Sequence, residues 1–296
     1  MIPLKTFSPI TGQTAAFHKL MLSAVAPRPI AFVSTVDEEG KVNLSPFSFF
    51  NAFSSNPPIL VFSPARRVRD NTTKHTLENV LKVPECVIHI VDFAIVEQMS
   101  LSSTEYEEGV NEFIKSGLTE QPSEEVKPPR VMEAPVAFEC KVREVISLGD
   151  NGGAGNMVVC EVLKMHVREN ILRSGTIDPV LLDPVARMGG NWYARLTEES
   201  LFEIPKPLSR KGIGVDQLPE AIRESNVLTG NNLARLANVE EMPVSQLAFL
   251  EKYAKTIEKI KGKHHGEERQ DVIHSLAKKL LERGDVEEAW QVLLAD

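Results

Sequence analysis

The chain has 296 residues and a formal net charge of −8, which argues against a general nucleic-acid-binding protein. No apolar run approaches the roughly 20 residues that span a bilayer, and residues 1–17 lack the pattern of a secretory signal. We therefore expect a cytoplasmic protein with no membrane partner. Cys86, Cys140 and Cys160 form no CxxC pair, and we interpret them as buried thiols rather than as a disulfide or a metal site.

Residues 29–167 are predicted to be mainly β-structure. Strands are expected at 30–36, 41–44, 59–63, 85–91, 137–145 and 157–167, where β-branched and aromatic residues concentrate. Asp37-Glu38-Glu39-Gly40 predicts a hairpin turn. Helices are expected at 75–81 and 94–101, and a polar surface excursion at 117–130. Many short strands with few helices favour a closed or split barrel.

The pattern changes after Pro205-Lys206-Pro207, where helical apolar spacing replaces the strand signal. Helices are expected at 218–224, 233–236, 244–261, 267–283 and 286–294. We therefore divide the chain into a barrel domain, residues 1–205, and a C-terminal all-helical extension, residues 206–296. Gly284 is expected to cap one helix and Asp285 to begin the next, so that the last two helices form an antiparallel hairpin.

The segment Asn43-Leu44-Ser45-Pro46-Phe47-Ser48-Phe49-Phe50-Asn51 interleaves small hydroxyl residues with aromatic residues. This mixture suits neither a core strand nor a solvent loop, and it predicts one wall of a site for a flat, polar-edged ring. Pro46 is expected to break regular strand pairing, which would leave backbone N–H groups for the ring. The alternative is a barrel strand whose phenylalanines fill the core. The candidate contacts are Asn43, Ser45, Pro46, Phe47, Ser48 and Phe49.

The following segment, residues 63–76, contains four cations and three threonines. Such side chains bind phosphate through charge-assisted hydrogen bonds. The candidates are Ser63, Arg66, Arg67, Asn71, Thr72, Lys74 and Thr76. The alternative is a solvated charged loop. A ring wall followed by a phosphate site suggests flavin mononucleotide, FMN.

Several motifs resemble the flavin reductase-like family of FMN-binding split barrels. They are residues 26–35, 43–50, 56–58, 74–80 and 186–193, and the likeness covers roughly residues 21–205. His75 stands where the family usually has aspartate, which puts the local hydrogen bonding in doubt. The resemblance implies a homodimer with the flavin near the interface, in which Met188 of one subunit approaches the other subunit's ring.

The resemblance further implies an oxidoreductase in which NADH or NADPH delivers hydride to FMN, and electrons pass to an acceptor or to a partner oxygenase or redox protein. No catalytic side chain and no metal ligand are expected, because the flavin carries the redox chemistry. A dinucleotide-binding glycine fingerprint is also missing from the sequence. Two alternatives stay open: a flavoredoxin-like electron carrier with little NAD(P)H turnover, and a non-catalytic flavin sensor that signals through the helical extension.

Weaker signals complete the sequence analysis. The glycine-rich residues 149–155 lack the ending of a P-loop and predict a flexible hairpin, or alternatively a border of the flavin site. Arg28 is either a flavin contact or a structural anchor. The isolated His18, His89 and His166 are expected to be structural, because none has metal-ligand neighbours in the sequence.

Overall fold

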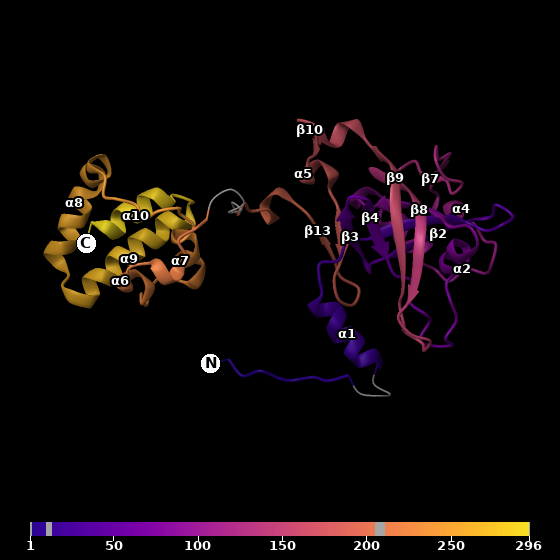
Figure 1. The fold of residues 1–296 in the computed structure, drawn as a ribbon, viewed down its shortest axis with the longest axis horizontal. Helices are drawn as coiled ribbons and strands as arrows, with labels where there is room; N and C mark the ends of the chain where they lie inside the picture. Colours follow the sequence, from indigo (N-terminus) through magenta and orange to yellow (C-terminus); the bar gives the residue numbers. More distant parts are fainter. Residues whose placement is uncertain (1, 10–13, 205–210, 296) are drawn as a thin grey trace. The chain divides into compact units, whose positions relative to one another are not determined.

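The computed structural model describes residues 2–9, 14–204 and 211–295, with the side chains of residues 14 and 247–250 left out. The chain separates into two compact units, Met1–Phe202 and Glu203–Asp296. The first unit contains the β-structure, and the described residues of the second form only helices and loops (Figure 1). The predicted boundary between residues 205 and 206 lies outside the described residues, so it stays a prediction.

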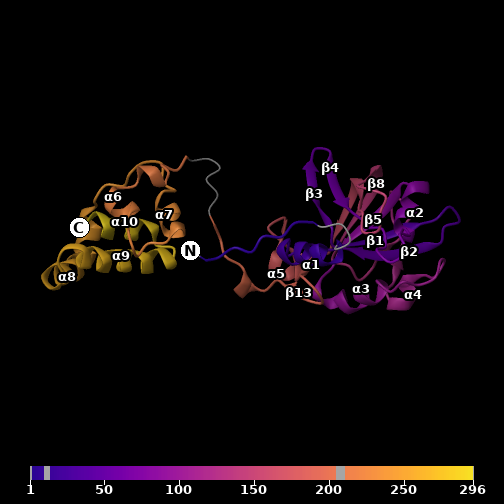
Figure 2. The same cartoon turned by 90° about the horizontal axis from the view of Figure 1, so that it is seen from below.

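An antiparallel seven-stranded sheet forms the centre of the first unit (Figures 1 and 2). Its strands follow one another in the order β2-β1-β5-β8-β9-β4-β3. The bounds are β1 Ala31–Val36, β2 Val42–Phe47, β3 Phe50–Ser55, β4 Pro58–Phe62, β5 Glu85–Ile90, β8 Val136–Ser147 and β9 Asn156–Val167. All six predicted strands are present. β3 was missed because five of its six residues are exposed and give no burial pattern.

The two edges of this sheet are consecutive in the sequence. β2 and β3 lie at opposite ends of the strand order, yet only Ser48 and Phe49 connect them. So short a connection requires the sheet to curl until its edges approach each other. The two edge strands do not pair with each other, so the barrel is split and not closed.

Each face of the curled sheet has its own apolar core. Inside, residues of β1, β2, β4, β5, β8 and β9 pack with Leu77 and Val80 of α2, His75–Lys82. Outside, Phe32 and Leu44 pack with Met99 and Phe113. The latter two come from α3, Val96–Ser102, and α4, Glu112–Ser116. The alternation of strand side chains between the faces therefore buries β1 completely.

The three cysteines belong to the inner core. Cys86, Cys140 and Cys160 are fully buried free thiols, as predicted, and the sulfurs of Cys86 and Cys160 lie 3.7 Å apart. Hydrogen bonding to Cys86 and burial both raise the pKa of Cys140 and Cys160. Within the described ranges no group of histidine, cysteine, aspartate and glutamate side chains could hold a metal.

Pro46 corrects one expectation. It lies within regular β2, in register with Phe32 of β1. β2 is an edge strand, so one side of its backbone has no neighbouring strand. The missing N–H of Pro46 can lie on that side, where no inter-strand hydrogen bond is lost. The prediction that Pro46 interrupts strand pairing is therefore wrong.

Shorter elements surround the sheet. A helix that was not predicted, α1, spans Thr14–Ala24. The expected excursion at 117–130 is held by a two-stranded ribbon. The remaining elements are η1 Phe93–Ile95, β6 Glu120–Gln121, β7 Arg130–Val131, η2 Glu169–Ile171, β10 Leu172–Arg173, β11 Thr176–Ile177, α5 Pro179–Leu182, β12 Val185–Arg187, β13 Tyr193–Arg195 and η3 Glu198–Ser200.

The second unit is helical, as predicted. Its elements are η4 Val215–Gln217, α6 Glu220–Arg223, α7 Gly230–Leu236, α8 Leu247–Lys263, α9 Gly266–Glu282 and α10 Val286–Leu294. Trp290 is buried in its core and donates its indole N–H to the Leu236 carbonyl at 3.1 Å. Gly284 has a φ of +90° just past α9, which confirms its capping role. Asp285 is the N-cap residue of α10, as predicted, but its side chain makes no capping hydrogen bond.

No helix in the described part of the chain combines the length and the apolar character needed to cross a bilayer.

Candidate functional site

The predicted ring wall lies at the split of the barrel, where β2 ends and β3 begins. Phe47 is buried in the inner core, and its ring centroid lies 5.3 Å from that of Phe62. Its side chain therefore fills the barrel, as the alternative interpretation expected. Ser48 and Phe49 are half-buried, and the Phe49 carbonyl accepts a hydrogen bond from the Ser63 N–H at 2.9 Å. This hydrogen bond links the end of β4 to the short connection between β2 and β3.

Ser45 and Pro46 are half-buried in β2, and Ser45 Oγ makes no hydrogen bond to any described residue. Asn43 is buried and donates from Nδ2 to Thr76 Oγ1 at 2.8 Å. Thr76 is itself buried in the first turn of α2. This pair fixes the start of α2 against β2, and it places both side chains inside the protein.

Arg66 and Asn71 organise the predicted phosphate segment. Arg66 donates from Nε to Asn71 Oδ1 and from Nη2 to the Asn71 carbonyl, each at 2.7 Å. Asn71 has a left-handed φ of 59°, a conformation that asparagine tolerates better than most residues. Its Nδ2 donates to the Asp150 carbonyl at 2.9 Å. The segment is therefore closed by its own hydrogen bonds, while residues 68–72 are exposed to solvent.

Arg67 is engaged by the same loop. Its Nη1 donates to Thr72 Oγ1 at 3.0 Å and to the Thr73 carbonyl, and its Nε lies 3.1 Å from Glu105 Oε1. Thr72 Oγ1 also donates to Asp70, and this bond lowers the pKa of Asp70 to about 2. Arg67 and Thr72 thus have protein partners of their own. Glu105 lies 38 residues from Arg67 in the sequence, and nothing in the sequence pattern indicated this ion pair.

Lys74 differs from the neighbouring arginines because it has no acidic partner. Among the described residues, no carboxylate lies within ion-pair distance of its amine, which sits 5.7 Å from the centroid of the Phe47 ring. Burial and then the charge of Arg67 lower the pKa of Lys74. Its charged form is therefore disfavoured in the protein alone, and a nearby anion would stabilise it.

Ser63 supplies a second unsatisfied group. Its Oγ is buried and has no hydrogen-bond partner in the described structure. A side chain at Gly155 would place its Cβ only 2.7 Å from this oxygen. The glycine-rich loop between β8 and β9 lies directly against this segment, since the Arg66 N–H donates to the Ala154 carbonyl at 2.8 Å. Ser63 therefore retains a free donor for a ligand.

Met188 is connected to the ring wall through Arg28. Arg28 is 5% exposed, and its guanidinium donates to the carbonyls of Leu22, Val25 and Met188, the last at 2.9 Å. Its Nε lies 3.5 Å from Ser48 Oγ. These contacts favour the structural-anchor interpretation of Arg28. Within the described structure no hydrogen bond or ion pair joins Met188 directly to the loop of residues 66–74.

The end of β2 and the loop of residues 63–76 together can accept a ligand that has a phosphate and a polar-edged ring. Lys74 lacks a counter-ion and Ser63 lacks an acceptor, and both groups lie close to the split of the barrel. A phosphate would satisfy both, because it accepts charge-assisted hydrogen bonds. The donor set therefore fits FMN.

Comparisons with known proteins agree with this chemistry. Residues 22–184 match the model of the flavin reductase like domain. An uncharacterised protein of Halalkalibacterium halodurans is 38% identical over 64% of this chain and 90% of its own length.

Two solved structures share the fold and about a third of the residues. Nitrilotriacetate monooxygenase component B from Bacillus cereus is 30% identical, with a TM-score of 0.65 over 69% of this chain and all of its own. The 2-nitrobenzoate 2-nitroreductase from Pseudomonas fluorescens is also 30% identical, with a TM-score of 0.59 over 70% of this chain and all of its own. The chain belongs to the flavin reductase-like family of split-barrel proteins.

Proposed function

We propose that this protein is an FMN-binding oxidoreductase in which NADH or NADPH reduces the flavin. The observation that carries the proposal is Lys74, a half-buried cation without an acidic partner in the described structure, in a chain of the flavin reductase-like family. One of the two similar solved structures is a nitroreductase, which supports reductive chemistry, and the other, a component of a monooxygenase, supports an oxygenase as partner.

The phosphate end of FMN would be held by Lys74, Ser63 and the outer face of Arg66. Arg67, Asn71 and Thr72 would support it by closing the loop with the hydrogen bonds that they already make. Asn43 and Thr76 would act from inside the protein, by positioning α2. Their contribution is therefore to the geometry of the site.

The ring would face the end of β2. Because the Phe47 side chain fills the core, we assign contact with the ring to the backbone and small side chains of residues 45–49. FMN supplies a ring that accepts and passes on hydride, so no protein nucleophile or acid-base pair is needed. The nicotinamide would bind over the flavin, since the sequence carries no dinucleotide fingerprint.

We also propose a homodimer with an electron acceptor that is a partner oxygenase or another redox protein. A groove of about 910 Å³ between α1 and residues 188–194 has an apolar lining, and Trp192 beside it is 77% exposed. A second copy of the chain would cover such a surface. Light scattering should show a dimer, whereas a monomer at micromolar concentration would contradict this assembly.

The absorbance spectrum of the freshly purified protein tests the cofactor. Yellow protein that keeps its colour after dialysis would identify FMN as a bound prosthetic group, and colourless protein that reduces added FMN would identify it as a substrate. Colourless protein that neither binds nor reduces FMN would overturn the proposal.

Stopped-flow mixing with NADH and with NADPH then tests the reductase activity. Rapid bleaching of the flavin by at least one of them is expected. A negligible rate with both would replace the reductase by a flavoredoxin-like carrier. If removal of residues 208–296 left reduction intact but abolished binding of a partner, the sensor alternative would gain support.

A further inference from the structure

A second pocket lies far from the split of the barrel. It has a volume of about 430 Å³, and it is lined by Gln121, residues 130–132, Ala134, Pro135, Ala137 and residues 165–168. The last four belong to the C-terminal end of β9 and the residue after it, whereas the FMN candidates lie near its N-terminal end, where Asn156 donates to the Pro64 carbonyl. Eleven steps of about 3.3 Å each separate the two ends of this strand, so the pocket is a separate site.

The pocket has a positive lining. Arg130 and Arg168 contribute the charge, His166 adds ring N–H chemistry, and none of the lining residues is acidic. Arg168 is oriented by Nη2, which donates to the Glu133 carbonyl at 2.6 Å. Arg130 is oriented by Nε and Nη2, which donate to the Pro122 carbonyl at 3.2 and 3.0 Å. In the described chain the Nη1 group of each arginine makes no hydrogen bond, so each guanidinium retains donors.

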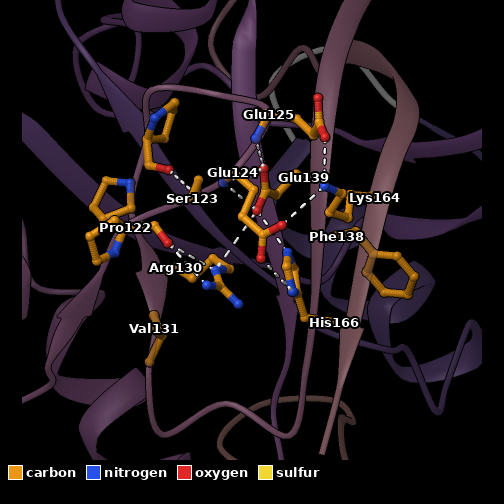
Figure 3. Close-up of polar contacts among 12 residues, drawn as sticks. Pro122, Ser123, Glu124, Glu125, Arg130, Val131, Phe138, Glu139, Lys164 and His166 are labelled. Atoms are coloured by element: carbon orange, nitrogen blue, oxygen red, sulfur yellow. Dashed lines mark hydrogen bonds and ion pairs between the residues drawn. The ribbon is translucent and has the colours of Figure 1, made fainter.

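A buried carboxylate positions Arg130 and His166 (Figure 3). Glu139 is fully buried in β8, and it accepts hydrogen bonds from the backbone N–H groups of Glu124 and Glu125. His166 Nε2 lies 2.7 Å from Glu139 Oε1, and Arg130 Nε lies 3.8 Å from the same oxygen. Figure 3 shows both side chains converging on this carboxylate from β7 and β9.

Glu139 is an ionised acceptor. Burial alone would raise its pKa, but the N–H groups of Glu124 and Glu125 and the ring of His166 hold the pKa below its ordinary value. A carboxylate can only accept, so His166 donates through Nε2 and its orientation is set. Glu139 thus lies against Arg130 and His166, whereas Arg168 has no ion pair in the described chain, so the pocket keeps a positive charge at Arg168.

An apolar part of the lining lies beside these polar groups. It consists of Val131, Met132, Ala134, Pro135 and Met165, and Met165 is 45% exposed. The volume falls within the range of small-molecule sites. From this combination we infer that the pocket binds a small organic carboxylate, whose charged end pairs with Arg130 and Arg168 while its compact apolar body lies against Met132 and Met165. The inference does not depend on the proposed FMN site.

Isothermal titration calorimetry with benzoate, on the full chain with and without saturating FMN, tests this site. Benzoate is expected to bind in both states, because the pocket is separate from the flavin site. Benzamide, which has the same shape without the charge, should bind at least about tenfold more weakly, as should inorganic phosphate, which has no apolar body.

Variants identify the pocket. Arg168→Gln should weaken benzoate binding by about tenfold or more, and Met165→Glu should abolish it by placing a negative charge at the rim without disturbing the Glu139 network. Arg173→Gln, a change at an exposed arginine outside the pocket, should bind benzoate as the unmodified chain does. No benzoate binding, equal binding of benzamide, or unchanged binding in Met165→Glu would each overturn the inference.

Discussion

Two charged residues, Lys74 just before α2 and Glu139 in β8, are accommodated differently by the protein. Toward the N-terminal end of β9, Lys74 is half-buried without an acidic partner among the described residues, and its lowered pKa means that its charged form is disfavoured. At its C-terminal end, the lowered pKa of Glu139 means that the charged form is favoured, because two residues donate backbone N–H groups to it and His166 and Arg130 approach it. A buried charge without a partner, such as Lys74, indicates a ligand-binding site. A buried charge with several hydrogen-bond partners, such as Glu139, stabilises the fold.

The largest effect should come from removing the unsatisfied cation together with its neighbour. Arg66→Ala combined with Lys74→Ala is expected to weaken FMN binding by about 3–6 kcal/mol, since each charge-assisted hydrogen bond contributes about 1.5–3 kcal/mol. Fluorescence titration of FMN measures the loss. The control is Lys82→Ala, an exposed cation of α2 whose amine lies 3.5 Å from Glu38. Unchanged affinity in the double variant would remove both residues from the site.

At the other end, Glu139→Gln should mainly affect stability. It removes a buried charge on which Arg130 and His166 converge, and such a loss typically costs about 3–5 kcal/mol. Urea unfolding measures the change in the free energy of unfolding. Glu144→Gln, an exposed change on the same strand, serves as the control and should be nearly neutral. Equal stability of the two variants would show that the network contributes nothing.

The pH dependence of unfolding sharpens the same contrast. Because the pKa of Glu139 is lower in the folded than in the unfolded state, its stabilisation is present above its unfolded pKa of about 4.3 and is lost as the pH falls through the folded value. The unmodified chain should therefore lose more stability than Glu139→Gln below about pH 4. Parallel pH profiles of the two proteins would contradict this assignment.

The smallest effect concerns Ser63. Ser63→Ala removes a buried hydroxyl that has no partner in the described structure, so the flavin-free protein should lose no stability. FMN affinity should nevertheless fall by about 1 kcal/mol, because a ligand acceptor loses its donor. Thermal unfolding without FMN and fluorescence titration with FMN separate the two effects. Ser55→Ala, on the exposed face of β3, should change neither.

Much of the fold could be predicted from the sequence because runs of β-branched residues mark strands that pack on two cores. β1 shows this plainly, with Ala31 and Val33 in the inner core and Phe32 in the outer core. β3 could not be predicted, since its exposed residues carry no such pattern. Pro46 misled the interpretation because sequence alone does not reveal that β2 lies at the edge of the sheet.

The site was less predictable than the fold. Residue types indicated a ring and a phosphate, but only the structure separates Phe47, which fills the core, from Ser63, whose hydroxyl is unsatisfied. The network of Glu139 and His166 was missed entirely. These residues lie 27 positions apart on two strands, and alternation along a strand shows which face a side chain takes but not which partner it meets.

The most direct test of the flavin assignment is a comparison of FMN with riboflavin, which carries the same ring without the phosphate. If Lys74 and Ser63 hold the phosphate, FMN should bind at least about a hundredfold more tightly than riboflavin, and Lys74→Gln should remove most of that advantage. Equal affinities for FMN and riboflavin in the unmodified chain would contradict the account.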